Sequence, residues 1–520
     1  MLQLSKNDTG DGRPDLTHHL SQEAKDRLPN PMKDIWQLVA ESGQPDLANM
    51  ANGDPHHSLY PFRQLMFEVP SVKESTDPVI AWRNGTCPTQ LIHSHKDESC
   101  ALTLRNAFQY THGAGLPECQ KIISDLTNFF FQPSNHDITL TLGNSDGITK
   151  LFRLLGTRGD HFLTDEFSFP AMTNAPLAYG INWVGVKMDS GGMIPEDLEK
   201  ILFHWDEEKN ERRPHVLYMV PVGQNPTGST LSLERRKSIY TIAQKWDLVI
   251  IEDDPYYFLQ YDLAPVPVEE NDFAKRFAKT LVPTMLSMDV DGRVCRVDSF
   301  SKIIGPGMRL GWITSNTMFR DHLIRYTDSA SQHPHAFGQA FISELLSSDG
   351  WQTEGFCRWL QSLRLDYQRR RDFLLDVFRR EVQPTGYASI NCPEGGMFVW
   401  IEIHFERHSR YILNPHTQGS PVVPRSNTES LLKELFQKLM DSQVVLIPAA
   451  PFAIKENELW IDSPSDHVPL RDVHFLSFLS RVRFMRATFA GTEDTIEKGM
   501  TRLGRALTEF FQEPPFTARL

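Results

Sequence analysis

The chain has 520 residues, 40% of them hydrophobic, and its 53 basic and 66 acidic side chains give a formal charge of −13. No run of 18 apolar residues occurs, which argues against a membrane-spanning helix. The acidic balance argues against nucleic-acid binding, because neutralising phosphates requires clustered Lys and Arg.

The middle of the chain alternates short apolar runs with helical patterns. A strand is predicted over residues 136–143 and a helix over 147–155. Further strands are predicted in chain order, with a helix over 232–246 among them, at 161–167, 181–188, 215–222, 247–254, 294–300 and 310–315. Strands that alternate with helices indicate βαβ units, so we expect an α/β fold with a mostly parallel sheet covered by helices on both faces.

The C-terminal third predicts a smaller α+β domain. A long amphipathic helix over 351–383 precedes a hairpin that turns at Gly395-Gly396. The remaining elements are a helix, two strands and a final helix, at 428–440, 444–448, 481–489 and 493–512. Two Pro-containing insertions, 262–292 and 405–427, are expected at the surface.

We expect three segments: an N-terminal arm with part of the small domain (1–62), a large domain (63–383) and the C-terminal small domain (384–520).

Three short motifs in the large domain carry candidate chemistry. The segment 297–314 presents Lys302 after a strand that ends Ser-Phe-Ser, with Arg309 seven residues later. Catalysis through a lysine amine requires a rigidly placed lysine beside groups that bind a phosphate. The motif 250–259 ends a strand in two carboxylates, which is costly in an apolar context unless they are paired or functional. The third motif, Asn-Pro-Thr-Gly at 225–228, is on its own a turn.

Together and in this order, the motifs resemble the fold-type I pyridoxal-phosphate enzymes. The resemblance is to class I aminotransferases, in particular the kynurenine/α-aminoadipate and fungal aromatic subgroup, and it covers roughly residues 30–512. It implies pyridoxal 5′-phosphate as cofactor and transfer of an amino group from an L-α-amino acid with a bulky, possibly aromatic side chain to a 2-oxo acid.

The resemblance also implies residue roles. Lys302 would form the internal aldimine and carry the proton in the 1,3-transfer, Asp253 would pair with the pyridine nitrogen, and Tyr256 would bind the ring hydroxyl. Asn225 would reach the same hydroxyl and the substrate carboxylate. The phosphate and ring would be held by Ser299, Ser301 and Arg309, by Asn144 and Ser145 in a helix N-terminal loop, and by the stacking ring of Phe169.

Two further roles follow from the resemblance. Tyr110 would reach the phosphate of a neighbouring subunit, which implies a homodimer with shared active sites. Arg486 would clamp the substrate carboxylate, with Arg481 and Arg483 as competing candidates. In a regular strand those two share one face and Arg486 lies on the other, so the assignment depends on the match to R-x-T-F-A.

The segment 50–62 departs from the family pattern. Gly53, a substrate-binding candidate, is retained, but Asn52 replaces a glycine, and His56 and His57 stand where relatives contact the substrate side chain. This is either neutral drift or a rebuilt pocket. The alternative activity is therefore a carbon–sulfur lyase that cleaves cysteine conjugates by β-elimination in fungal secondary metabolite biosynthesis, such as that of epidithiodiketopiperazines. A transcription regulator on this fold would need a basic N-terminal domain, which the charge disfavours.

The cellular location is expected to be cytoplasmic. The first 30 residues lack the apolar region of a secretory signal, and six scattered cysteines without CxxC spacing indicate reduced thiols and no metal site. The C-terminal Ala518-Arg519-Leu520 resembles a relaxed peroxisomal signal and leaves that compartment as the alternative.

Overall fold

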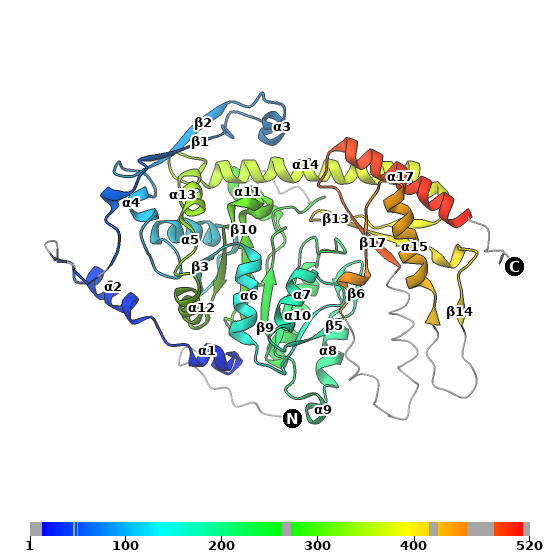
Figure 1. Ribbon diagram of the computed structural model, residues 1–520, viewed down its shortest axis with the longest axis horizontal. Helices are drawn as coiled ribbons and strands as arrows, with labels where there is room; N and C mark the ends of the chain where they lie inside the picture. Colours follow the sequence, from blue (N-terminus) through cyan, green and yellow to red (C-terminus); the bar gives the residue numbers. More distant parts are fainter. Residues whose placement is uncertain are drawn as a thin grey trace.

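The computed structural model describes residues 13–44, 47–48, 50–51, 53–262, 272–414, 425–454 and 483–512. A seven-stranded sheet forms the centre, a four-stranded sheet lies toward the C-terminal end, and a long hairpin lies on the N-terminal side (Figure 1). None of the described helices combines the length and apolar character that crossing a membrane requires.

The central sheet confirms the predicted mostly parallel α/β core. Its strand order is β3-β11-β10-β9-β8-β4-β5, and only β11 runs antiparallel to its neighbours. The strands are β3 (Asp137–Thr141), β4 (His161–Asp165), β5 (Asn182–Val186), β8 (Val216–Met219), β9 (Val249–Asp253), β10 (Val294–Ser299) and β11 (Gly311–Ser315). Successive residues of β4, β8, β9, β10 and β11 are all buried, which requires cover on both faces.

Helices surround this sheet. They are α5 (Pro117–Phe131), α6 (Asn144–Leu155), α7 (Pro170–Leu177), α8 (Pro195–Phe203), α9 (Glu207–Asn210), α10 (Leu233–Trp246), α11 (Phe273–Thr280), α12 (Thr317–Ala330) and α13 (Ala336–Leu345). α6 contacts β3, β9, β10 and β11, so its N-terminus lies near the middle strands. α10 begins at Ser232, whose side chain accepts a hydrogen bond from the Arg235 N–H, and ends at Asp247 in the left-handed conformation. The short strands β6 (Met188–Asp189) and β7 (Gly192–Met193) form a separate pair.

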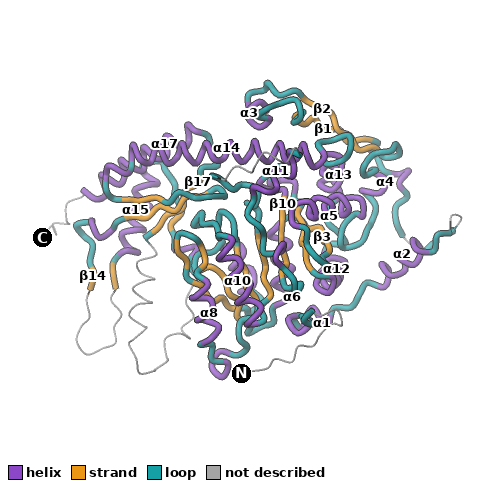
Figure 2. The backbone as a smooth tube through the Cα atoms, turned by 180° about the vertical axis from the view of Figure 1, so that it is seen from behind, coloured by secondary structure: helices purple, strands orange, loops and turns teal. Residues whose placement is uncertain are grey.

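The C-terminal part is built on one 30-residue helix, α14 (Gln352–Glu381). In both views α14 runs along the top of the central sheet toward α17 (Glu493–Gln512), against which it packs (Figures 1 and 2). The four-stranded antiparallel sheet has the order β12-β13-β17-β16. Its strands are β12 (Ala388–Ile390), β13 (Phe398–Ile403), β16 (Ile447–Pro448) and β17 (Phe484–Thr488), with α15 (Thr428–Asp441) beside α17. The predicted smaller α+β unit is therefore confirmed.

The N-terminal side holds elements that the sequence pattern did not predict. β1 (Gln64–Pro70) and β2 (Thr89–His95) form an antiparallel hairpin with alternating exposure, and α3 (Pro78–Arg83) between them packs on α14. The short helices α1 (Gln22–Asp26), α2 (Pro31–Glu41) and α4 (Leu104–Ala107) complete this region.

One insertion differs from the expected surface loop. The described part of 262–292 contains α11, and Phe277, Met285 and Asp289 are buried. Asp289 accepts hydrogen bonds from the backbone N–H groups of Gly292, Arg293 and Val294, so this acidic loop is anchored in the core. In the other insertion, Phe405 and His408 are buried, β14 (Leu413–Asn414) pairs with β15 (Arg425–Ser426), and 415–424 lie outside the described residues.

The two sheet-bearing parts meet at bare backbone. A Cβ added to Gly223 would lie 2.2 Å from Cα of Gly396, so neither position has room for a side chain. The junction is also hydrogen-bonded, because Gly396 N–H donates to Leu259 O (2.9 Å) and Tyr261 N–H donates to Glu394 O (2.7 Å). The turn before β13 is thus packed against the loop after β8 and hydrogen-bonded to the segment after β9.

Candidate active site

The predicted catalytic residues gather at the carboxyl edge of the central sheet. Asp253 is the last residue of β9, Ser299 is the last of β10, and Lys302 follows in a short 3-10 turn, Phe300–Lys302. β9 and β10 are parallel neighbours, so their carboxyl ends lie side by side. This edge is where α/β sheets bind ligands.

Asp253 is a buried carboxylate bound by neutral donors. The Asn144 amide donates to one of its oxygens, and the Tyr218 hydroxyl donates to the other at 2.8 Å. Burial raises the pKa of Asp253 to about 6, against the lowering effect of these hydrogen bonds. A cationic N–H facing this carboxylate would offset the cost of its burial. Tyr218 was not among the predicted residues; its only sequence signal is a tyrosine near the end of a buried strand.

Asp254, the second carboxylate of the motif, has a structural partner. Its side chain lies 3.1 Å from the fully buried guanidinium of Arg296, which also lies 2.8 Å from Asp298 and 3.2 Å from Glu252. The guanidinium is 4.3 Å from the ring centre of Phe131. Sequence reasoning missed this ion cluster, because its two pairs of residues, 252/254 and 296/298, are brought together only by the pairing of β9 with β10.

Lys302 has an amine shifted toward its neutral form. Burial, and then the positive charges of Arg309 and Arg486, lower the pKa of Lys302. A neutral amine can act as a nucleophile or accept a proton, whereas an ammonium cannot.

Beside Lys302, the structure forms a cradle for an anion. Ser299 Oγ donates to Ser301 Oγ (2.7 Å), and Arg309 Nη1 lies 3.4 Å from Ser301 Oγ. Gly143, the N-cap of α6, has φ +97°, and a Cβ there would lie 2.7 Å from Arg309 Nη2. The guanidinium therefore lies against the open N-terminus of α6, where unpaired backbone N–H groups favour an anion. Asn144 and Ser145 are the first two residues of this helix, but the Asn144 side chain turns to Asp253.

Arg486 is the predicted carboxylate clamp, and the structure separates it from its competitors. Its Nη1 donates to Asn225 Oδ1 at 2.6 Å, which links β17 to the Asn-Pro-Thr-Gly loop. The Arg486 guanidinium lies 4.5 Å from the ring centre of Phe398 and 4.9 Å from that of Phe452. Arg483 instead pairs with Glu402, and Arg481 lies outside the described residues.

Tyr256 and Phe169 flank this group. Tyr256 is buried, its ring lies edge-on to Phe398 with centres 5.9 Å apart, and burial and Asp253 raise its pKa. Phe169 is half-buried at the N-cap of α7.

Two predicted residues do not join the site within this chain. Tyr110 is 51% exposed, with its ring near His333. Gly53 is also exposed, and a Cβ built there would meet nothing within 4 Å.

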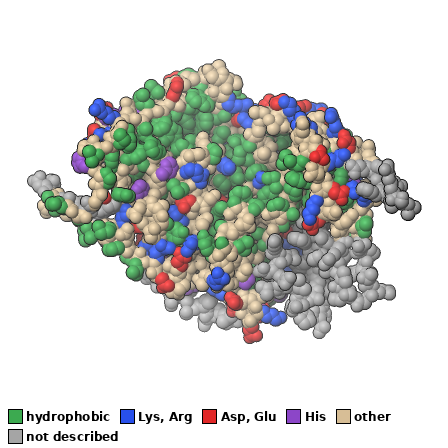
Figure 3. Space-filling view, viewed as in Figure 1, with side chains coloured by type: hydrophobic (Ala, Val, Ile, Leu, Met, Phe, Trp, Pro, Cys, Tyr) green, Lys and Arg blue, Asp and Glu red, His purple; other side chains and the backbone are tan. Residues whose placement is uncertain are grey.

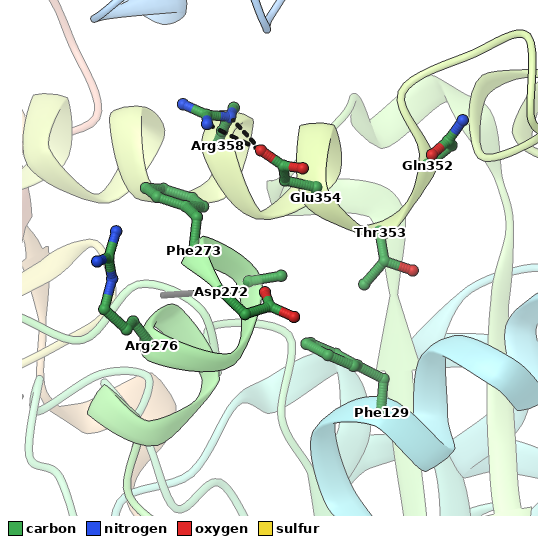
Figure 4. A pocket seen from close by; sticks show the side chains of 9 residues that line it. Phe129, Asp272, Phe273, Arg276, Gln352, Thr353, Glu354 and Arg358 are labelled. Carbon is green, nitrogen blue, oxygen red and sulfur yellow. Dashed lines mark hydrogen bonds and ion pairs between the residues drawn. The ribbon is translucent and has the colours of Figure 1, made fainter. Parts of the chain in front are cut away.

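A cavity of about 600 Å³ lies between α5, α11 and α14 (Figure 4). Its lining includes Asp272, Arg276 and the hydrogen-bonded pair Glu354–Arg358. None of the residues predicted for the active site lines it.

The family model described as "Aminotransferase class I and II" matches residues 77–465. The L-tyrosine:2-oxoglutarate aminotransferase amt1 of Serpula lacrymans is 51% identical over 511 residues, 96% of each chain. The L-tyrosine:2-oxoglutarate aminotransferase atrD of Tapinella panuoides is 48% identical, also over 96% of each chain.

Among solved structures, the aminotransferase Aro8 of Candida albicans superimposes with a TM-score of 0.80 at 29% identity. The match covers 96% of this chain and 99% of the other. The similarity thus extends over both sheet-bearing parts.

Proposed function

This chain belongs to the class I and II aminotransferase family, and we propose that it transfers the amino group of an aromatic L-amino acid, L-tyrosine foremost, to 2-oxoglutarate. The choice of substrates is supported by the names of the two fungal relatives, which are about half identical over nearly the whole chain. The single structural observation that carries the proposal is the Arg486–Asn225 pair beside Lys302, bordered by the rings of Phe398 and Phe452.

The family uses pyridoxal 5′-phosphate, and the residues at the sheet edge fit that cofactor. The space kept by Gly143 between the α6 N-terminus and Arg309 suits a phosphate, and Asp253, buried among neutral donors, suits a protonated ring nitrogen. When bound, this cofactor supplies a carbonyl that reacts with the substrate amine and a ring that accepts the electrons left when the Cα–H bond breaks. We propose that Ser299, Ser301 and Arg309 hold its phosphate and that Phe169 and Tyr256 border its ring.

Lys302 is proposed as the group that moves the proton. Its lowered pKa favours a neutral Nζ, which can accept the proton from the substrate Cα and return it elsewhere. Arg486 would bind the substrate carboxylate through its two terminal nitrogens, and Asn225, already bound to one of them, would hold the guanidinium in plane.

A homodimer is proposed on the basis of an exposed apolar face. We define this apolar face as Leu59, Met66, Leu91, Tyr110 and Phe337, each at least half exposed. Hydrophobic side chains gather over the region of β1, β2, α4 and α13 (Figure 3). A monomer rarely exposes such a surface, and a second copy seated on it would bring Tyr110 toward the partner's cofactor.

The deciding experiment is product analysis of purified holoenzyme given single amino acids without an acceptor. L-Tyrosine should yield one equivalent of its oxo acid and then stop, because the amino group stays with the cofactor until 2-oxoglutarate removes it. Repeated release of pyruvate and ammonia from an S-substituted cysteine, with no such stop, would instead establish the carbon–sulfur lyase.

A paired substitution tests the carboxylate clamp. Arg486→Lys removes the bidentate contact and should raise the KM for tyrosine about 10–100-fold, while the absorption spectrum of the bound cofactor stays unchanged. Arg483→Lys is the matched control, since Arg483 pairs with Glu402, and its KM should stay near that of the wild type. Equal effects of the two substitutions would overturn the assignment of Arg486.

A further inference from the structure

A histidine cluster lies at the opposite edge of the central sheet from the active site. His18 and His19 end a short 3-10 turn, Thr17–His19, before α1. They meet Asp247, the C-cap of α10, just before β9 begins. His215 and Asp160, which directly precede β8 and β4, continue the cluster. All five residues thus stand at the amino ends of strands or on the segment that covers them, whereas Lys302 and Asp253 lie at the carboxyl ends.

The contacts form a chain from one carboxylate to another. His215 Nε2 lies 3.4 Å from Asp160 Oδ2, and the Nδ1 atoms of His215 and His19 lie 3.0 Å apart. His19 Nε2 lies 3.3 Å from Asp247 Oδ1. On the exposed side, His18 Nε2 lies 2.7 Å from Asp247 Oδ2.

This row of contacts has fewer N–H protons than hydrogen bonds to make. The three contacts between Asp160, His215, His19 and Asp247 need one proton each, but two neutral imidazoles carry only one N–H apiece. His19 is 1% exposed. When both imidazoles are neutral, one of the three contacts joins two acceptors.

In the arrangement in which both histidine Nδ1 atoms share a hydrogen bond, the missing proton is the one at His19 Nε2. If His215 donates to Asp160 and His19 donates to His215, the lone pair of His19 Nε2 faces the Asp247 carboxylate. This nitrogen is buried and has no hydrogen-bond partner among the described residues. An unpaired lone pair beside a carboxylate is costly, and a cation placed between them would satisfy both.

We propose that His18, His19 and Asp247 bind a divalent transition-metal ion of the Zn²⁺ class. The three ligand atoms all lie within 4.8 Å of one another. Ligands of a tetrahedral Zn²⁺ at 2.0–2.2 Å lie about 3.4 Å apart, close to the 3.3 Å between His19 Nε2 and Asp247 Oδ1. Water would supply the fourth ligand, and the exposed His18 provides the entry path.

One feature of the surroundings supports a metal, and two cationic side chains also face the cluster. The second nitrogen of His19 contacts His215, which in turn contacts Asp160, so an outer partner orients the His19 ring as outer partners orient metal-binding histidines. Arg293 Nη1 lies 3.4 Å from Asp247 Oδ1, and Arg212 donates to the His18 carbonyl. Among the described residues, these two guanidinium groups are the other charges that face the cluster; they hold Asp247 and the turn in place but make no contact with His19 Nε2.

The consequence would be an anchored N-terminal segment. The ion would tie residues 17–19 to the end of α10 and thereby fix α1, which packs on α6. α6 carries the anion cradle at its other end, yet no ligand of the metal belongs to the active site, so basal activity should not require it.

The test is metal binding by tag-free, cofactor-loaded full-length protein after dialysis against chelating resin. We expect one equivalent of Zn²⁺ per chain by titration calorimetry and mass spectrometry, and a tetrahedral absorption spectrum when Co²⁺ replaces it. His18→Ala and Asp247→Asn should each weaken binding about 10–100-fold. Asn tolerates the left-handed conformation of residue 247, so this variant should keep the helix end. His93→Ala, at an exposed histidine on β2, is the matched control and should bind normally.

Two results would overturn the proposal. One is an absence of bound Zn²⁺, or binding that His18→Ala and Asp247→Asn leave unchanged. The other is a zinc-free protein whose stability increases as the pH falls, together with an Asp247→Asn variant whose stability does not depend on pH. In that case a proton, and not a metal ion, would supply the missing positive charge. If the proposal is correct, added Zn²⁺ should raise the Tm of the wild type and of His93→Ala, but not that of His18→Ala or Asp247→Asn.

Discussion

At the level of single residues, two adjacent carboxylates of one motif have different surroundings. Asp253 and Asp254 are neighbours, so their side chains leave the strand in opposite directions. Asp254 points to Arg296 and belongs to the ion cluster of the core. Asp253 points to Asn144 and Tyr218 and has no arginine within ion-pair distance among the described residues, which leaves its charge for a ligand.

The raised pKa of Asp253 has a measurable consequence for the cofactor-free chain. Its folded pKa, about 6, exceeds the usual value of 3.8, so folding favours the protonated form. The group therefore costs stability once the pH rises through 4 to 6, and costs little below that range. Asp253→Asn removes this titration, so the Tm difference between variant and wild type should become more positive from pH 5 to pH 8.

The measurement is thermal unfolding of both cofactor-free proteins at the two pH values. A Tm difference that is the same at both pH values would reflect only the altered hydrogen bonds to Asn144 and Tyr218, and it would contradict the raised pKa.

The assignment of Arg486 shows how far the sequence alone can predict a single site residue. Strand alternation separated Arg486 from Arg483 but could not say which face meets the substrate. The structure adds Asn225 and Glu402 as partners, and these come from distant segments. Lys302, Asp253 and Arg309 could be predicted because each stands in a short local motif. Tyr218, Phe398 and Phe452 could not, since only folding brings them to the site.

At the scale of elements, the N-terminus of α6 depends on the backbone of Gly143. Gly143→Ala would place a methyl group 2.7 Å from Arg309 Nη2 and force a side chain into φ +97°. We expect a loss of about 1–3 kcal/mol of stability and faster loss of cofactor on dialysis, because the displaced guanidinium no longer lines the anion cradle.

Gly305→Ala is the control for this substitution. Gly305 lies in the same loop as Arg309, but its φ is 173° and a Cβ there meets nothing within 4 Å. Cofactor retention, followed by absorbance, should match the wild type. Equal loss from the two variants would contradict the role given to Gly143.

The elements of the central sheet were predictable for a physical reason that the N-terminal hairpin lacks. Buried parallel strands are continuous apolar runs, and the helices between them have clear polar faces. β1 and β2 alternate at an exposed surface and contain Glu68, His93 and Pro70, so their pattern resembles a loop. α11 was missed because it follows a Pro-rich stretch and has only eight residues.

At the scale of the whole molecule, the apolar face predicts association. Leu91→Asp combined with Phe337→Asp introduces two charges on that face and should convert a dimer to a monomer in sedimentation velocity. Activity should fall with it, because Tyr110 would no longer reach a partner. Val290→Asp, at an exposed apolar residue elsewhere, should leave the dimer intact. A wild-type chain that sediments as a monomer would contradict the homodimer.

The contact between Gly223 and Gly396 sets a limit on redesign. Phe398 and Phe452, whose rings border Arg486, stand on one side of that contact, and Asn225 stands on the other. Changing the two phenylalanines alters the rings around Arg486, while the backbone contact that positions Arg486 against Asn225 stays the same. A larger residue at either glycine would push the loop that holds Asn225 away from the turn before β13. A library aimed at new amino-acid substrates should therefore vary the rings and keep both glycines constant.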